Sequence, residues 1–350
     1  MSGALRIVHA IRSDGFSGVE RYVLRLAAAQ ARAGAEVHVI GGDPAGMRDG
    51  LAENGVTHTA AARTHEVIAA LRGRRTNCDV VNTHMTAADL AAFAALAGRR
   101  RRPAVVATRH FAGRRGRIGP VPIDRIVGGT IDAELSISAA VAEAIGRPSI
   151  VVHSGLDPRR PAELARGRTV LIAQRLQPEK QTALGLDAFA RSGIAAAGWQ
   201  LWIAGKGPER ERLEARVQEH ALGSSVRFLG YRSDVPDLMD RSGILLAPCP
   251  VEGLGLTVLE AMQSGLPVVA ARAGGHIEVL EGLDDRSLFA SADPEAAASA
   301  LRSLAEDDLG RALLGAAGRE RQRADYTIDA QVQGTDAVYR AALRSRGVGQ

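Results

Sequence analysis

The chain is poor in cysteine, lysine, aromatic residues and long apolar runs. Its two cysteines, Cys78 and Cys249, lie far apart, which excludes a disulfide framework and indicates a reducing cytoplasm as the compartment. Aromatic residues make up only 3%, so the core has to be built from Ala, Leu, Val and Ile. No run of about 18 apolar residues lacks a charge, which excludes a membrane span. The first residues lack the pattern of a secretory signal, so we expect none.

Arginine carries almost all of the positive charge, since Lys180 and Lys206 are the only two lysines among 44 basic residues. Residues 1–160 hold 22 basic and 14 acidic side chains (+8), whereas residues 161–350 hold 22 and 25 (−3). The basic first half suits an anionic acceptor or an anionic membrane face, or it is a solvated arginine-rich surface. Aromatic residues scarcely occur there, which argues against nucleic acid as a partner. The arginines concerned are Arg99–Arg102, Arg109, Arg114, Arg115 and Arg117.

Short apolar runs alternate with segments of helical periodicity along the whole chain. Such runs, separated by helices, predict parallel strands covered on both faces. They come in two series, so we predict an α/β fold of two Rossmann-like, doubly wound domains that face each other across a cleft. Strands are expected at 5–11, 36–42, 78–84, 104–110, 134–138 and 149–155, and at 169–175, 199–205, 225–230, 243–249 and 266–272. Helices are expected at 19–34, 182–193, 208–223 and 254–265.

A segment rich in Pro, Gly and Arg, at 153–168, separates the two series of strands. We therefore expect an N-terminal domain over residues 1–160 and a second domain over residues 161–325. A final amphipathic segment at 326–345 predicts a C-terminal helix. We expect this last part of the chain, residues 326–350, to pack back toward the N-terminal domain.

The most informative segment is the glycine turn that runs from Glu252 to Gly255 and opens a helix through about Gln263. The first turn of a helix leaves backbone N–H groups without internal partners, and the helix dipole adds partial positive charge there. Such a turn can bind phosphate or sugar oxygens. Glu252 and Glu260 have seven residues between them, so they point at different parts of one elongated ligand. The alternative is that Glu260 is a surface helix residue and Glu252 an acid at the helix start.

Motifs of metal and cofactor chemistry are missing from the sequence. The nine histidines show no His-Glu-x-x-His spacing and the cysteines no paired spacing, so we expect no metal site. The chain has no Gly-x-x-x-x-Gly-Lys-Ser/Thr motif, which argues against ATP hydrolysis by a P-loop. The glycines after the strand at 36–42 lack the dinucleotide spacing. We therefore expect no cofactor.

Several segments, in order along almost the whole chain, resemble family 4 of the retaining GT-B glycosyltransferases. The two carboxylates, the Gly-Leu-Gly between them and the trailing SGLPVVA resemble that family's Glu-x7-Glu region. The resemblance implies a GT-B fold and a hexosyltransferase that moves a sugar from a UDP- or GDP-sugar to an acceptor hydroxyl, with retention and without a metal. The other matching segments are DGFSGVERYVLRLA at 14–27, CDVVNTH at 78–84, VVATRH at 105–110, HSGLDP at 153–158, IAQRLQPEKQ at 172–181, LWIAGKGPERERLE at 201–214 and VRFLGYRSDVPDLM at 226–239.

The resemblance also implies roles for single residues, with the donor bound by the second domain and the acceptor by the first. Arg175 and Lys180 would hold the donor diphosphate and neutralise it as it leaves, and Gly18 would offer a backbone N–H near the same phosphates. Glu252 would bind the hydroxyls of the donor sugar, and Glu260 those of the ribose.

Further roles follow in the same way. His110 would face the reacting carbon, and Tyr231 and Arg232 would border the nucleobase. The amides of Leu254, Gly255 and Leu256 would assist Glu252 at the sugar. The candidates on the acceptor side are Asp14, His84 and Arg109, of which Asp14 can also be a turn residue and His84 a strand-end residue.

The sequence departs from the family pattern at positions where other residues are usual, namely Ser17, His153, Ser154, Gln174, Gln181, Cys249 and Leu254.

Two other functions stay open. One is a nucleotide-sugar epimerase on the same fold, and the other is a non-catalytic protein that binds a nucleotide-sugar or an anionic surface. The sequence does not identify the acceptor, for which a small molecule and a lipid-linked glycan are the two candidates. The chain is expected in the cytoplasm, with contact to the inner membrane face through the basic first domain as one option.

Overall fold

The computed structural model describes residues 4–74, 77–99, 101–160 and 165–347. The chain divides into two compact units, one of Met1–Asp157 with Thr327–Gln350 and one of Pro158–Tyr326. The division falls inside the segment 153–168 that separates the two series of strands. Residues 161–164 of that segment, and Arg100 of the arginine run, lie outside the described residues.

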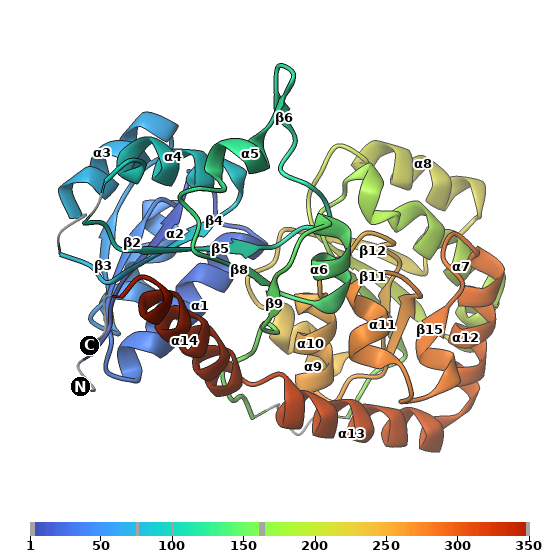
Figure 1. Cartoon of the computed structure of the whole chain (residues 1–350). Helices are drawn as coiled ribbons and strands as arrows, with labels where there is room; N and C mark the ends of the chain where they lie inside the picture. Colours follow the sequence, from blue (N-terminus) through green and yellow to red (C-terminus); the bar gives the residue numbers. More distant parts are fainter. Residues whose placement is uncertain (1–3, 75–76, 100, 161–164, 348–350) are drawn as a thin grey trace. The chain divides into compact units, whose positions relative to one another are not determined.

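The first unit is built on a seven-stranded sheet in which every neighbouring pair is parallel (Figure 1). The strand order reverses between β1 and β4, and ligands bind near the carboxyl ends of strands at such a point. In sheet order the strands are β3 (Thr57–Thr59), β2 (Glu36–Ile40), β1 (Arg6–Ile11), β4 (Val80–His84), β5 (Ala104–Arg109), β8 (Ala133–Ser136) and β9 (Ile150–Val151).

Helices connect these strands, and the last helix of the chain belongs to the same unit. α14 (Ile328–Ser345) begins where the Thr327 hydroxyl accepts from the Ala330 N–H at 3.2 Å, and it packs on α1, β5 and β8. A short antiparallel hairpin follows β5, formed by β6 (Arg117–Ile118) and β7 (Val121–Pro122). The other helices are α1 (Gly18–Arg32), α2 (Pro44–Ala52), α3 (Thr64–Arg74), α4 (Thr86–Leu96), α5 (Ile123–Val127) and α6 (Ala139–Ile145).

The second unit repeats the plan with a six-stranded parallel sheet. In sheet order the strands are β12 (Val226–Gly230), β11 (Gln200–Ala204), β10 (Thr169–Ala173), β13 (Ile244–Ala247), β14 (Val268–Ala271) and β15 (Leu288–Phe289). The helices are α7 (Thr182–Ser192), α8 (Arg210–Glu219), α9 (Val235–Arg241), α10 (Leu256–Gln263), α11 (Gly275–Leu280), α12 (Pro294–Glu306) and α13 (Asp308–Asp325), with short 3-10 turns η1 (Pro178–Lys180), η2 (Ile194–Ala197) and η3 (Asp285–Ser287).

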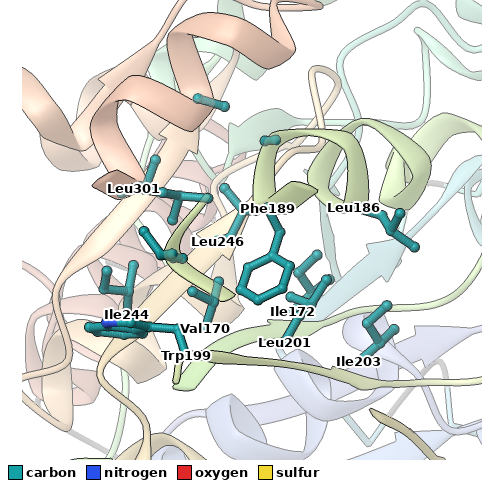
Figure 2. Close-up of a cluster of buried hydrophobic side chains, with 14 of the residues drawn as sticks. Val170, Ile172, Leu186, Phe189, Trp199, Leu201, Ile203, Ile244, Leu246 and Leu301 are labelled. Atoms are coloured by element: carbon teal, nitrogen blue, oxygen red, sulfur yellow. The ribbon is translucent and has the colours of Figure 1, made fainter. Parts of the chain in front are cut away.

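The core of the second unit lies between its sheet and the helices α7 and α12 (Figure 2). Phe189 of α7 points into a cluster of aliphatic side chains that come from β10, β11 and β13. Each such side chain, when fully buried, contributes about 1.5–3 kcal/mol relative to an exposed one. The core therefore holds the strand ends of this unit in fixed positions. The labelled members are Val170, Ile172, Leu186, Phe189, Trp199, Leu201, Ile203, Ile244, Leu246 and Leu301.

The predicted α/β fold with two parallel sheets is confirmed. The strand expected at 149–155 is shorter than predicted, because only Ile150 and Val151 pair with β8, at the edge of the sheet. Both side chains are exposed, at 49% and 37%, so their apolar character does not reflect burial. β3 was not predicted because its sequence, Thr-His-Thr, has no apolar residue.

Candidate active site

The loop after β10 carries the two basic residues that the resemblance assigned to the donor diphosphate. Gln174 holds this loop in place, because its side-chain amide donates to the Lys180 carbonyl and to Thr182 Oγ1, both at 2.9 Å. Arg175 points largely into solvent, with 61% of its side chain exposed, and its guanidinium lies 3.7 Å from the Glu179 carboxylate. The loop therefore presents Arg175 as an exposed cation and keeps Lys180 closer to the protein.

Lys180 forms an ion pair with Glu252, with 2.6 Å between Nζ and Oε2. The two residues follow β10 and β13, which are neighbours in the sheet, so the parallel topology brings them together. Burial disfavours the charged form of Lys180, but the Glu252 carboxylate outweighs it and raises the pKa of Lys180. Burial would likewise raise the pKa of Glu252, yet the Lys180 ammonium lowers it. Both groups are therefore charged at neutral pH.

The glycine turn that carries Glu252 is fixed by close backbone packing against the loop after β14. A Cβ on Gly274 would lie 2.3 Å from the Glu252 carbonyl oxygen, and one on Gly275 would lie 2.3 Å from Leu254 Cα. Gly255, at φ 95°, is the N-cap of α10. Leu254 is 1% exposed, so its side chain belongs to the core and its backbone alone remains for a ligand.

The other donor-side residues lie on α10 and on the loop after β12. Leu256 is the first residue of α10 and Glu260 lies one turn later, and both are partly buried. Tyr231 follows β12 directly and is 58% exposed. Arg232 donates from Nε to Asp234 Oδ1 at 2.7 Å, so an acid already binds its guanidinium. Except for Gly18, the residues assigned to the donor thus lie in the second unit, on segments that follow β10, β12 and β13.

In the first unit, the loop before α1 is held by Glu20. Gly18 is the first residue of α1, and a Cβ on it would meet no atom within 4 Å. Ser17 N–H donates to Glu20 Oε2 at 2.9 Å, and Ser13 Oγ donates to Glu20 Oε1 at 2.5 Å. Asp14 lies on an exposed bend of the same loop.

The two histidines of the predicted acceptor side are buried and in contact. His84 ends β4 and His110 follows β5, and their Nδ1 and Nε2 atoms lie 3.0 Å apart. Arg109, which we also assigned to the acceptor side, is 8% exposed. Its Nη2 donates to the Gly113 carbonyl at 2.7 Å, and its Nη1 lies 3.5 Å from Glu134. These contacts bind its guanidinium within the unit and favour a structural role.

The arginine-rich stretch is partly internal, which corrects the expectation that these arginines form a surface. Arg115 has no exposed side-chain area and lies 2.6 Å from Asp89, 2.6 Å from Asp124 and 2.7 Å from Glu134. Arg102 pairs with Asp132 at 2.8 Å. Such buried cations are bound to acids because an unpaired buried charge is costly. Fewer arginines of this stretch are therefore available at the surface than the sequence count indicates.

Two residues beside the Lys180–Glu252 pair were not predicted. His276 is 1% exposed, and a Cβ on Gly255 would lie 3.0 Å from its Cδ2 atom. Burial lowers the pKa of His276, although Glu252 opposes the shift. Cys249 is buried, and burial raises the pKa of its thiol. The signal that could have identified His276 is its place directly after Gly274-Gly275, at the end of a predicted strand.

Three further observations concern the part of the chain that the structure describes. No group of three or more His, Cys, Asp or Glu side chains in it is placed to hold a metal ion. None of its helices combines the length and the hydropathy that crossing a bilayer requires. Cys78 and Cys249 are free and buried.

Two family models match the chain, one on each unit. The model described as Glycosyltransferase Family 4 matches residues 16–160, and the model described as Glycosyl transferases group 1 matches residues 157–321. The two matches meet where the structure divides the chain, after Asp157.

Individual known proteins are similar to large parts of the chain. It is 26% identical over 234 residues to the lipopolysaccharide core biosynthesis mannosyltransferase LpsB of Rhizobium meliloti. The matched region is 61% of this chain and 67% of LpsB. It is 36% identical over 133 residues to a GDP-mannose-dependent alpha-(1-6)-phosphatidylinositol dimannoside mannosyltransferase of Mycobacterium tuberculosis, over 37% of this chain and 33% of that protein. The solved structure of HepE from Anabaena with UDP and glucose has a TM-score of 0.80 at 18% identity and covers 95% of this chain and 99% of that one. This likeness confirms the GT-B fold.

Proposed function

The chain belongs to glycosyltransferase family 4 (glycosyl transferases group 1), and we propose that it moves a sugar from a nucleoside diphosphate-sugar to an acceptor hydroxyl with retention at the anomeric carbon. The observation that carries this proposal is the ion pair of Lys180 with Glu252, at 2.6 Å, on two loops at the carboxyl ends of neighbouring strands. A cation next to a carboxylate gives one site for a diphosphate and for sugar hydroxyls.

In the proposed reaction the ammonium of Lys180 and the guanidinium of Arg175 stabilise the negative charge that develops on the leaving diphosphate. Such stabilisation works best when the donors are in place before the bond breaks. Glu252 already holds Lys180 in its charged form, as the direction of both pKa shifts indicates. The departing phosphate oxygen takes the proton of the acceptor hydroxyl as the new glycosidic bond forms on the same face.

We further propose that Glu252 accepts hydrogen bonds from the donor sugar and Glu260 from the ribose. The first amides of α10 support this assignment, because N–H groups at a helix start have no partner within the helix. UDP- and GDP-sugars are the donors to test first. HepE was solved with UDP and glucose, and one mycobacterial relative is GDP-mannose-dependent. We propose that no metal is needed, and undiminished transfer in excess EDTA is the expected result.

For the first unit we propose that His110 contacts the sugar from the acceptor side. The acceptor is a small molecule or a lipid-linked glycan, handled in the cytoplasm at an anionic membrane face. The hairpin of β6 and β7 supports membrane contact, since Ile118 and Val121 are 53% and 42% exposed there and Arg114 and Arg117 are exposed close by. Flotation with vesicles containing an anionic lipid tests this, and binding that persists in the I118S/V121S variant would contradict it.

The main experiment measures donor binding and transfer with a matched pair of lysine variants. A ligand that binds only the folded state raises the melting temperature, so a thermal screen of UDP-, GDP- and dTDP-sugars identifies the donor. Lys180→Met is expected to lose the donor-dependent shift and the transfer. Lys206→Met changes the chain's other lysine, which is exposed, and is expected to keep both.

The outcomes separate the proposal from the two functions that the sequence left open. Near wild-type transfer by Lys180→Met would refute the assignment of Lys180 to the donor diphosphate. Isomerised sugar after incubation with donor alone would identify an epimerase. Donor binding without turnover across a broad acceptor panel would identify a binding protein.

A further inference from the structure

Three buried histidines form a continuous hydrogen-bonded chain in the first unit. His9 of β1, His84 of β4 and His110 after β5 lie on neighbouring strands. His110 Nε2 lies 3.0 Å from His84 Nδ1, and His84 Nε2 lies 3.0 Å from His9 Nδ1. The chain continues from His9 Nε2 to Gln30 Oε1 at 2.8 Å, and from Gln30 Nε2 to Asp336 Oδ1 at 2.8 Å. It thus links α14 to the strand end that carries His110.

The three rings are neutral. Burial lowers the pKa of His9 to about 4 and that of His110 to about 3. Burial also lowers the pKa of His84 well below its ordinary value, and its two histidine neighbours add to the shift. A neutral imidazole has one N–H donor and one acceptor nitrogen, so each ring can donate in one direction only. Three such rings in a row must therefore all point the same way.

Asp336 sets that direction. An ionised carboxylate only accepts, so the Gln30 amide must turn its NH2 toward Asp336 and its oxygen toward His9. Burial raises the pKa of Asp336, while the bond from Gln30 and the charge of Arg340 favour its ionised form. His9 then has to donate from Nε2 to Gln30 and accept at Nδ1 from His84 Nε2. His84 in turn accepts at Nδ1 from His110 Nε2, so all three rings carry their proton on Nε2.

We propose that Asp336 and Gln30 are positioning residues that fix the tautomer of His110, so that its Nδ1 presents a lone pair to a substrate hydroxyl. Among the described residues, none bonds this Nδ1. The Tyr22 ring packs edge-on against His110, with 4.7 Å between ring centroids, and restrains the imidazole from turning over. The second part of the proposal, that a hydroxyl binds there, rests on the proposed function, whereas the tautomer does not.

The test is a direct reading of the tautomers by NMR. Full-length protein with ¹⁵N-labelled histidine is studied at neutral pH, where two-bond proton–nitrogen couplings distinguish the protonated ring nitrogen from the bare one. The wild type is expected to carry the proton on Nε2 of all three rings. Asp336→Asn removes the group that only accepts, and a measurable population of His110 with the proton on Nδ1 is expected. Gln30→Leu leaves His9 Nε2 without an acceptor, and a larger shift in the same direction is expected.

Thr108→Val is the matched control. It removes the buried bond of 2.8 Å from Thr108 Oγ1, on the strand that precedes His110, to Asn82 Oδ1 on β4, and this bond is not one of those that link the three histidines, Gln30 and Asp336. This variant is expected to leave the His110 tautomer unchanged. Asp336 is only partly buried, so its variant is expected to fold even if Gln30→Leu does not.

An unchanged His110 tautomer in Asp336→Asn, or a proton on Nδ1 in the wild type, would overturn the proposal. A shifted His110 tautomer in Asp336→Asn, together with a wild type that transfers no sugar, would support the tautomer proposal and refute the proposed function. If both hold, transfer by Asp336→Asn falls by about tenfold, taking the lower end of the effect known for residues that orient a metal-bound histidine as the nearest comparison, while Thr108→Val keeps its rate.

Discussion

Replacing Arg115 with methionine should destabilise the first unit by about 3 kcal/mol. The Arg115 side chain has no exposed area, and those of Asp89 and Glu134 are only 2% exposed. Removing one partner of a buried ion pair costs about 3–5 kcal/mol, because the remaining charge is left uncompensated. Arg147 stays 3.1 Å from both Asp124 and Glu134 and offsets part of the loss, so the low end of this range applies.

The measurement has to be local, because both tryptophans, Trp199 and Trp202, lie in the second unit and their fluorescence does not report on the first. Hydrogen exchange followed by mass spectrometry resolves the two units. Each 1.4 kcal/mol is a factor of ten, so the slowest amides of β5 and β8 should exchange about a hundredfold faster in Arg115→Met. Peptides from β10 and β11 should be unaffected.

Arg125→Met, at an exposed position of α5, is the control and should change stability by less than about 0.5 kcal/mol. The loss in Arg115→Met should also shrink as pH falls below about 4. Burial favours a higher pKa of Asp124, but Arg115, together with Arg147, outweighs burial and lowers this pKa. The stabilisation that Asp124 gains from Arg115 is therefore present above the pKa of Asp124 in the unfolded chain, and it is lost as pH falls through the pKa of Asp124 in the folded protein. In the variant, protonation removes the uncompensated charge. A pH-independent loss, or an exchange rate like that of Arg125→Met, would refute this reasoning.

Further predictions concern the second unit. Lys180→Arg keeps the charge but should lower kcat about tenfold to a hundredfold in a nucleotide-release assay, since a planar fork replaces an ammonium 2.6 Å from Glu252. Gln181→Gly should raise stability by up to about 1 kcal/mol in tryptophan-detected unfolding, because Gln181 has φ 49°. Gly275→Ala should reduce the donor-induced rise in melting temperature, since its Cβ would lie 2.3 Å from Leu254 Cα. The pKa of Lys180 is raised and that of Glu252 is lowered, so the contribution of the pair to stability should decline as pH rises above about 10.4 and as pH falls below about 4.3. A thermal comparison with K180M/E252Q should be flat between these limits.

Much of the fold could be predicted because the strands are apolar and the turns are marked by glycine. The predicted helix through Gln263 ends there, and Gly265, at φ 66°, follows it. The edge of a sheet is harder to predict, since a strand such as Thr57–Thr59 needs one neighbour and no buried face. The opposite error occurs at the other edge of this sheet. The apolar residues around Ile150 and Val151 predict a strand over 149–155, but only these two residues pair with β8.

The candidate site was predicted residue by residue, whereas its contacts depend on which strands are neighbours. Lys180 and Glu252 were assigned to different ligand groups, and their direct pairing follows only from the adjacency of β10 and β13. The same holds for His9, which no motif marks and which the order of β1, β4 and β5 places next to His84. The count of charged residues includes Arg115 but could not predict that this side chain is buried and paired with Asp89 and Glu134.

The scarcity of lysine becomes informative once the two lysines are placed. Lys206 is exposed, and its backbone carbonyl accepts from the Leu176 N–H at 2.9 Å, a contact that any residue can supply. The Lys180 ammonium is only partly exposed, at 17% of the side chain, and meets one carboxylate oxygen. A guanidinium carries five donors in a fixed plane and needs more acceptors at such a site. In a chain that otherwise uses arginine for positive charge, we therefore expect the site to need a compact and rotatable cation beside Glu252, and full activity of Lys180→Arg would refute that expectation.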